Sequence, residues 1–209
     1  MRRVLRVLPG RQVIASNGRG GAFLCDTRAG GKEGVELIAL ESVISESVPP
    51  RLHMVLSLLK GKDLEEPVEG LCQLNIDAIH LVTTEHTQEF KGQNHDRLVE
   101  RLRVKSLVGL KQAKKAWLTA IHEPVPLRDW RKSHEDMPLI LVHPGEDTLP
   151  ETPPETVGML IGPEGGFSRA ELEWLGKQEC HNLGLGTTRI RGIHAPLLAC
   201  GKLMGKFWL

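Results

Sequence analysis

Short apolar runs, separated by polar and glycine-rich stretches, dominate this chain and predict many strands. In the N-terminal part the strand candidates are residues 13–15, 22–25 and 35–40. The first two flank the sequence Ser-Asn-Gly-Arg-Gly-Gly at residues 16–21, whose composition is typical of a hairpin turn. Strands this short and this close together predict a small β-barrel.

Beyond residue 50 the apolar runs are longer and alternate with helical stretches. Buried strands are predicted at residues 53–59, at 157–161, and at 138–145, where the strand ends in a turn. Helices are predicted at residues 94–115 and 197–207. Strands that alternate with helices predict an α/β fold, with a parallel sheet covered by helices on its faces.

A domain boundary is predicted at the consecutive prolines Pro49 and Pro50. Two adjacent prolines resist the continuation of both a helix and an inner strand. We therefore expect a small β domain at residues 1–48 and an α/β domain at residues 51–209.

The most informative stretch covers residues 157–171, where an apolar strand leads into a glycine turn and then into a helix. Ser168 and Glu171 have the spacing of a capping box, which marks the helix start. Glycines expose backbone N–H groups without side chains, so a ligand can approach the main chain closely. Three glycines do so here: Gly162, Gly165 and Gly166. A plain strand-to-helix turn is the alternative.

Two familiar nucleotide motifs are excluded at this turn. The Lys and hydroxyl residues of a phosphate-binding P-loop are missing, and the glycine spacing does not match the G-x-G-x-x-G dinucleotide fingerprint.

Charge is nearly balanced overall, at +1, but it is segregated along the chain. Five arginines and no acid precede Asp26, and no acid follows Glu179. The helix predicted at residues 94–115 is also cationic. Such segregation favours phosphate binding, and a solvated basic face is the alternative in each case.

The four cysteines are scattered without a C-x-x-C pair or zinc-site spacing, so reduced thiols and no metal are expected. No run of 18 apolar residues occurs. Both observations favour a soluble cytoplasmic protein.

The residues from Leu160 to Ser168, Leu-Ile-Gly-Pro-Glu-Gly-Gly-Phe-Ser, resemble the signature of the RsmE family of ribosomal RNA uridine-N3 methyltransferases, members of the SPOUT class. Residues 5–10 and 17–21 resemble the PUA-like barrel that precedes the catalytic domain in that family. The resemblance implies an α/β-knot fold, a homodimer, S-adenosylmethionine as methyl donor, and N3 of a uridine in 16S small-subunit ribosomal RNA as its target.

The resemblance also implies roles for individual residues. Arg191 is expected near the uracil oxygen or its phosphate, and Glu164 either acts as a general base or shapes the loop. Arg6, Arg19 and Arg189 are expected to contact RNA. The donor is expected to lie against Leu141, Val142, His143, Gly162, Pro163, Gly165, Gly166, Leu185 and Gly186. A lone histidine such as His143 is also compatible with a purely structural role.

Residues 187–196 depart from the family pattern. Ile193 stands where the family has Glu, His194 where it has Thr, and Thr188 where Arg is usual. Two alternatives to an active methyltransferase follow: a catalytically impaired SPOUT-fold RNA-binding protein, or a generic α/β enzyme that binds another nucleotide at Gly162–Gly166. Donor binding and turnover would separate the three.

Overall fold

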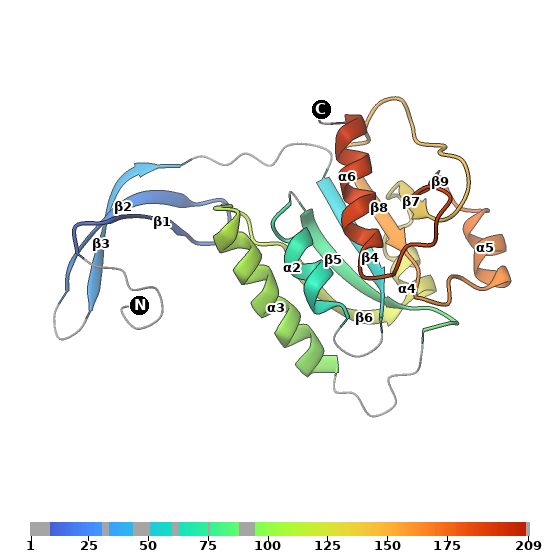
Figure 1. Ribbon diagram of the computed structural model, residues 1–209, viewed down its shortest axis with the longest axis horizontal. Coiled ribbons are helices and arrows are strands. Elements are labelled where there is room, and N and C mark those ends of the chain that lie inside the picture. Colours follow the sequence, from blue (N-terminus) through green and yellow to red (C-terminus); the bar gives the residue numbers. More distant parts are fainter. Residues whose placement is uncertain are drawn as a thin grey trace.

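The computed structural model describes residues 9–30, 34–43, 51–59, 63–74, 76–87 and 95–207, and Figure 1 shows a small sheet beside a larger α/β body. The small sheet is antiparallel, with the order β1-β2-β3. Its strands are β1 (Gln12–Ser16), β2 (Ala22–Ala29) and β3 (Val35–Ser42). The three strands predicted from the sequence are confirmed. A closed barrel is not confirmed within the part of residues 9–43 that the structure describes.

The turn between β1 and β2 is held by an asparagine side chain. Asn17 Oδ1 accepts hydrogen bonds from the backbone N–H groups of Arg19 (2.7 Å) and Gly21 (3.0 Å). Gly18 and Gly20 have φ angles of +70° and +90°, which residues other than glycine rarely adopt. The predicted hairpin therefore forms from local interactions.

The larger sheet has six parallel strands in the order β6-β5-β4-β8-β7-β9. They are β4 (Arg51–Ser57), β5 (Ile76–Thr83), β6 (Ala120–Pro126), β7 (Leu139–Val142), β8 (Thr156–Ile161) and β9 (Cys180–Leu183). The predicted parallel sheet is confirmed. The two edge strands, β6 and β9, were not predicted, because β6 contains polar residues and two prolines, and β9 has only four residues, two of them polar.

Two apolar clusters hold helices on opposite faces of this sheet (Figure 1). The first cluster contains buried residues of α2 (Glu65–Leu71), α3 (His95–Gln112) and α6 (Ala195–Phe207). The second contains buried residues of α4 (Leu127–Lys132) and α5 (Arg169–Leu175). Neighbouring strand residues divide between the faces: Leu56 belongs to the first cluster and Val55 to the second.

The cationic helix α3 is partly neutralised by packing. Arg101 Nε lies 2.9 Å from Glu65 Oε1 on α2. Lys105 Nζ lies 2.6 Å from Glu69 Oε2, also on α2. Arg103 pairs with Glu123 of β6 at 3.1 Å. These cations therefore fix α3 against its neighbours, and the sequence alone could not show this.

Histidines lie side by side across three adjacent strands. His53 on β4 hydrogen-bonds His80 on β5, with 2.9 Å between Nδ1 and Nε2. The ring of His80 stacks on His122 of β6 with 4.4 Å between centroids, and His134 meets it edge-on at 5.0 Å. His80 is only 5% exposed. Burial, followed by the three neighbouring histidines, lowers the pKa of His80 from 6.5 to about 3.

The four cysteines are free thiols, and Cys25, Cys72 and Cys200 are buried, which agrees with the prediction. Within the described ranges, no helix has the length and apolarity needed to cross a bilayer. Arg6 and the Pro49-Pro50 boundary lie outside the described residues.

Candidate functional site

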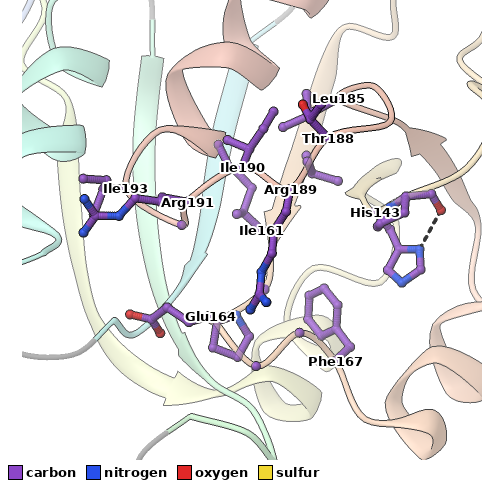
Figure 2. Close-up of a pocket in the computed structure, with 18 of the residues that line it drawn as sticks. His143, Ile161, Glu164, Phe167, Leu185, Thr188, Arg189, Ile190, Arg191 and Ile193 are labelled. Atoms are coloured by element: carbon purple, nitrogen blue, oxygen red, sulfur yellow. Dashed lines mark hydrogen bonds between the residues drawn. The ribbon is translucent and has the colours of Figure 1, made fainter.

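A cavity of about 770 Å³ opens at the carboxyl ends of β7, β8 and β9 (Figure 2). Three chain segments that follow these strands form its walls, at residues 142–144, 161–167 and 185–193, and Asp63 and Ala195 complete it. The carboxyl edge of a parallel sheet is where α/β proteins bind ligands. The cavity therefore lies where the glycine turn predicted it.

The glycine turn after β8 forms the floor of this cavity. Gly166 N–H donates to the Pro163 carbonyl at 2.9 Å, which closes the turn, and Gly166 has a φ of +71°. A Cβ on Gly162 would lie 2.9 Å from Cε2 of Phe167, so only glycine admits this ring. The backbone of the turn is consequently exposed to the cavity, and the Phe167 ring packs against Gly162.

The capping box predicted at Ser168 and Glu171 is present and extends to a distant loop. The Ser168 hydroxyl accepts from Glu171 N–H at 3.1 Å, and Glu171 Oε2 accepts from Ser168 N–H at 2.9 Å. The second oxygen, Oε1, accepts from the backbone N–H of Glu85 at 2.9 Å. The Glu171 carboxylate is 4% exposed, and it fixes the glycine turn, α5 and the loop after β5 together.

The cavity wall after β7 is held by an asparagine of β9. Asn182 Nδ2 donates to the His143 carbonyl at 3.2 Å and to the Glu146 carbonyl at 2.9 Å. The His143 ring donates from Nδ1 to the Pro144 carbonyl at 2.9 Å, a contact that keeps the other ring nitrogen available as an acceptor.

The third wall, which begins at Leu185, is tied to the last helix. Lys202 on α6 contacts Asp147 Oδ2 at 2.6 Å and donates to the Gly184 carbonyl at 2.7 Å. Gly184 N–H donates to Asp147 Oδ1 at 2.9 Å. The Lys202 hydrogen bond, followed by that from Gly184, lowers the pKa of Asp147, so this carboxylate is ionised at neutral pH. Gly186 follows with a φ of +102°, and a Cβ there would meet no atom within 4 Å.

The charged side chains are divided across the cavity, as Figure 2 shows. Arg189 extends from its loop toward the glycine turn. Arg191 and Glu164 point to the side away from His143. Cations and an acid thus lie around a backbone-lined cavity, an arrangement that can hold an organic ligand and stabilise an anion beside it.

The structure brings most of the predicted site residues together. Of the residues expected around the donor, Leu141 is the exception, because its side chain packs against the second apolar cluster. Both Arg189 and Arg191 line the cavity, whereas Arg19 lies in the β1–β2 turn. The lining residues that sequence reasoning missed are Asp63, Ile161, Phe167, Thr188, Ile190, Gly192 and Ala195. No sequence motif around Asp63 indicated a binding site. Asp63 reaches the cavity because the turn before α2 lies beside it.

Comparison with known proteins places the chain among RNA-modifying enzymes. The RNA methyltransferase domain family matches residues 46–204. The ribosomal RNA small subunit methyltransferase E of Mesomycoplasma hyopneumoniae is 20% identical over 156 residues, which cover 73% of this chain and 68% of that protein.

Solved structures show the same fold. A ribosomal RNA small subunit methyltransferase E from Neisseria gonorrhoeae, bound to S-adenosyl methionine, has a TM-score of 0.85 at 17% identity, covering 99% of this chain and 87% of that one. A putative methyltransferase from Legionella pneumophila, in complex with the same cofactor, has a TM-score of 0.84 at 24% identity, with coverages of 98% and 86%.

Proposed function

The chain belongs to the RNA methyltransferase domain family, and on that premise we propose that it transfers a methyl group from S-adenosylmethionine to N3 of a uridine in 16S small-subunit ribosomal RNA. The observation that carries this proposal is the cavity at the carboxyl ends of β7, β8 and β9, whose lining includes the glycine turn, Arg191 and Glu164. The two solved neighbours that bind S-adenosylmethionine support the choice of donor.

The residues of the cavity fit this donor. Its volume of about 770 Å³ lies within the range of sites for small organic ligands. Gly166 and Gly186 leave open space where a Cβ would point, so polar groups of a ligand can reach the main chain. Ile161, Phe167 and Leu185 supply apolar surface. When bound, the donor supplies a methyl group on a sulfonium, which is transferred by direct displacement.

The protein must also position and activate the uracil. N3 of uracil carries a proton at neutral pH and lies on the Watson–Crick edge, so the base must be unpaired and must lose that proton. We assign Arg191 to stabilise the resulting negative charge on the base. Glu164 either accepts the proton or shapes the turn that it shares with Gly162 and Gly165.

Several finer features belong to the same proposal. We infer an α/β-knot in the larger domain, a PUA-like barrel at residues 1–48, a cytoplasmic location and a homodimer. Arg6 and Arg189 are assigned to RNA phosphate contacts. Light scattering on the purified protein tests the dimer.

Ile193 favours a second candidate function, an RNA-binding protein that has lost catalysis. This apolar side chain lines the cavity and packs against the first apolar cluster, at the position where the resemblance implies an acid. Such a protein would bind RNA and could retain the donor site, but it would not transfer a methyl group.

Calorimetric titration with S-adenosylmethionine and S-adenosylhomocysteine is the first test. Saturable binding of both supports the donor site, and a folded protein that binds neither contradicts it. The purified protein is then incubated with unmodified small-subunit RNA and the donor. Mass spectrometry of the nucleosides should show 3-methyluridine. Donor binding without any methylated nucleoside would support the second candidate.

Arg191→Ala tests the assignment within the site. Loss of one charge-stabilising group typically lowers the rate about 10²- to 10³-fold, while donor affinity should stay nearly unchanged. Arg169→Ala is the matched control, because the Arg169 side chain is 94% exposed and pairs with Glu173 on α5. For Glu164→Gln, lost transfer with normal donor binding identifies a base, and weakened donor binding identifies a role in shaping the turn.

A further inference from the structure

Figure 1 shows the β1–β2 turn beside the C-terminal end of α3. An exposed tryptophan lies at this junction. Trp117 belongs to the loop between α3 and β6, and 48% of its surface is accessible. Arg19 is its bridge partner in the turn, and Leu118 follows it and is 41% exposed. The exposed Lys111 lies in the last turn of α3, and the exposed Lys114 lies just after the helix. We call these five residues the hairpin patch.

The position of the tryptophan ring is fixed by backbone contacts. Gly20 N–H donates to the Ala116 carbonyl at 3.0 Å, and Leu118 N–H donates to the Gly18 carbonyl at 2.9 Å. A Cβ on Gly20 would lie 2.7 Å from Cε2 and 2.9 Å from Cη2 of Trp117, so the benzo part of the ring rests directly on this glycine. The indole is thus seated on one side while about half of its surface faces solvent.

The charge around this ring is uncompensated. Arg19, Lys111 and Lys114 form no ion pair with any described residue. No Asp or Glu occurs at residues 12–25 or 101–122, which surround the patch in sequence. The cations earlier in α3 differ, because Arg101, Arg103 and Lys105 pair with acids of α2 and β6. The hairpin patch therefore combines an ordered aromatic surface with free positive charge.

We propose that the hairpin patch binds an unpaired segment of the RNA substrate, with one base stacked on Trp117 and the neighbouring phosphates near its cations. Aromatic rings flanked by cations are how proteins hold single strands, since every base has a stacking face and a duplex hides it. This inference rests on the proposed function, which makes RNA the substrate. The hairpin patch lies next to edge strand β6, whereas the cavity lies at β8, β7 and β9, toward the opposite edge of the sheet. The hairpin patch would therefore hold RNA at a distance from the cavity.

The test measures binding of a fluorescein-labelled oligouridine and of an abasic ribose-phosphate oligomer of the same length to the full chain. We expect Trp117→Ala to weaken oligouridine binding about five- to hundredfold, which is the range for loss of one stacked base. Binding of the abasic oligomer should not change, and Trp117→Phe should retain most of the affinity. Arg19→Gln should reduce the slope of log affinity against log salt by about 0.7. Lys177→Gln, an exposed lysine after α5, is the charge control.

Four results would overturn the inference: no binding of oligouridine by the unmodified chain, equal affinities of the chain and Trp117→Ala, equal weakening of both oligomers, or an equal effect of Lys177→Gln. Donor titration and methylation assays separate this inference from the proposed function. Methyl transfer with an unaffected Trp117→Ala variant contradicts the inference alone. Base-dependent binding at Trp117 without methyl transfer contradicts the proposed function alone.

Discussion

The buried histidine His80 should make the stability of this protein depend on pH between neutrality and acid. A histidine buried as the neutral base binds its proton less readily in the folded chain than in the unfolded chain. The pKa of His80 falls from 6.5 to about 3 on folding. Its contribution is therefore complete above pH 6.5 and is lost as the pH decreases from there toward 3.

The magnitude follows from these two pKa values. At pH 5 the unfolded chain is almost fully protonated at this site and the folded chain is not, which lowers the free energy of unfolding by about 2 kcal/mol relative to pH 7.5. Burial also lowers the pKa values of His53 and His122, so their losses add in the same direction. Asp77 opposes this effect at His53, and Arg103 adds to it at His122.

His80→Phe removes the titrating group and keeps a planar ring to stack on His122. The variant loses the hydrogen bond to His53, at a cost of about 1 kcal/mol at every pH. Urea unfolding at pH 7.5 and 5.0, followed by circular dichroism, gives the acid-induced loss for each protein. That loss should be smaller in the variant by about 2 kcal/mol.

Ile79→Val provides the control, because Ile79 is fully buried next to His80 on β5 and carries no titrating group. This variant should lose about 1 kcal/mol at both pH values, so its acid-induced loss should equal that of the unmodified chain. If His80→Phe showed the same loss as the unmodified chain, His80 would not be the neutral, desolvated group that the stack of rings implies.

Three further changes test the walls of the cavity. Gly162→Ala places a Cβ 2.9 Å from the Phe167 ring, so donor affinity measured by calorimetry should fall at least tenfold; unchanged affinity would show that the ring can move. Glu171→Gln leaves one of its two backbone contacts without a good acceptor and should cost about 1–2 kcal/mol in urea unfolding. Asp147→Asn removes the charge paired with Lys202, so proteolysis within residues 184–193 should accelerate while global stability changes by less than about 1 kcal/mol.

Features encoded in neighbouring residues were predictable from the sequence. The hairpin at residues 16–21 and the capping box of Ser168 and Glu171 are closed by side chains within a few positions of their partners. The glycine turn likewise identified the cavity, since Gly162 and Gly166 shape it locally.

Features that depend on packing between distant segments were not predictable. The basic composition of α3 is compatible with either an RNA-binding helix or a solvated helix. The structure shows that Arg101 and Lys105 form ion pairs with α2, which packs beside it. Asp63 lines the cavity, whereas the side chain of Leu141 packs against the second apolar cluster. Both placements depend on contacts between segments that are distant in sequence. Edge strand β9 has no apolar alternation and forms through pairing with β7.

The order in which the cavity walls appear along the chain has a consequence for protein synthesis. A ribosome makes the wall after β7 first, then the glycine turn, and only near the end the segment at residues 185–193 with the helix that anchors it. A nascent chain that has reached residue 175 holds five of the six strands of the large sheet but lacks the third wall. Ligand binding thus requires synthesis to continue through α6, and premature termination at residue 175 would yield a sheet without the complete cavity.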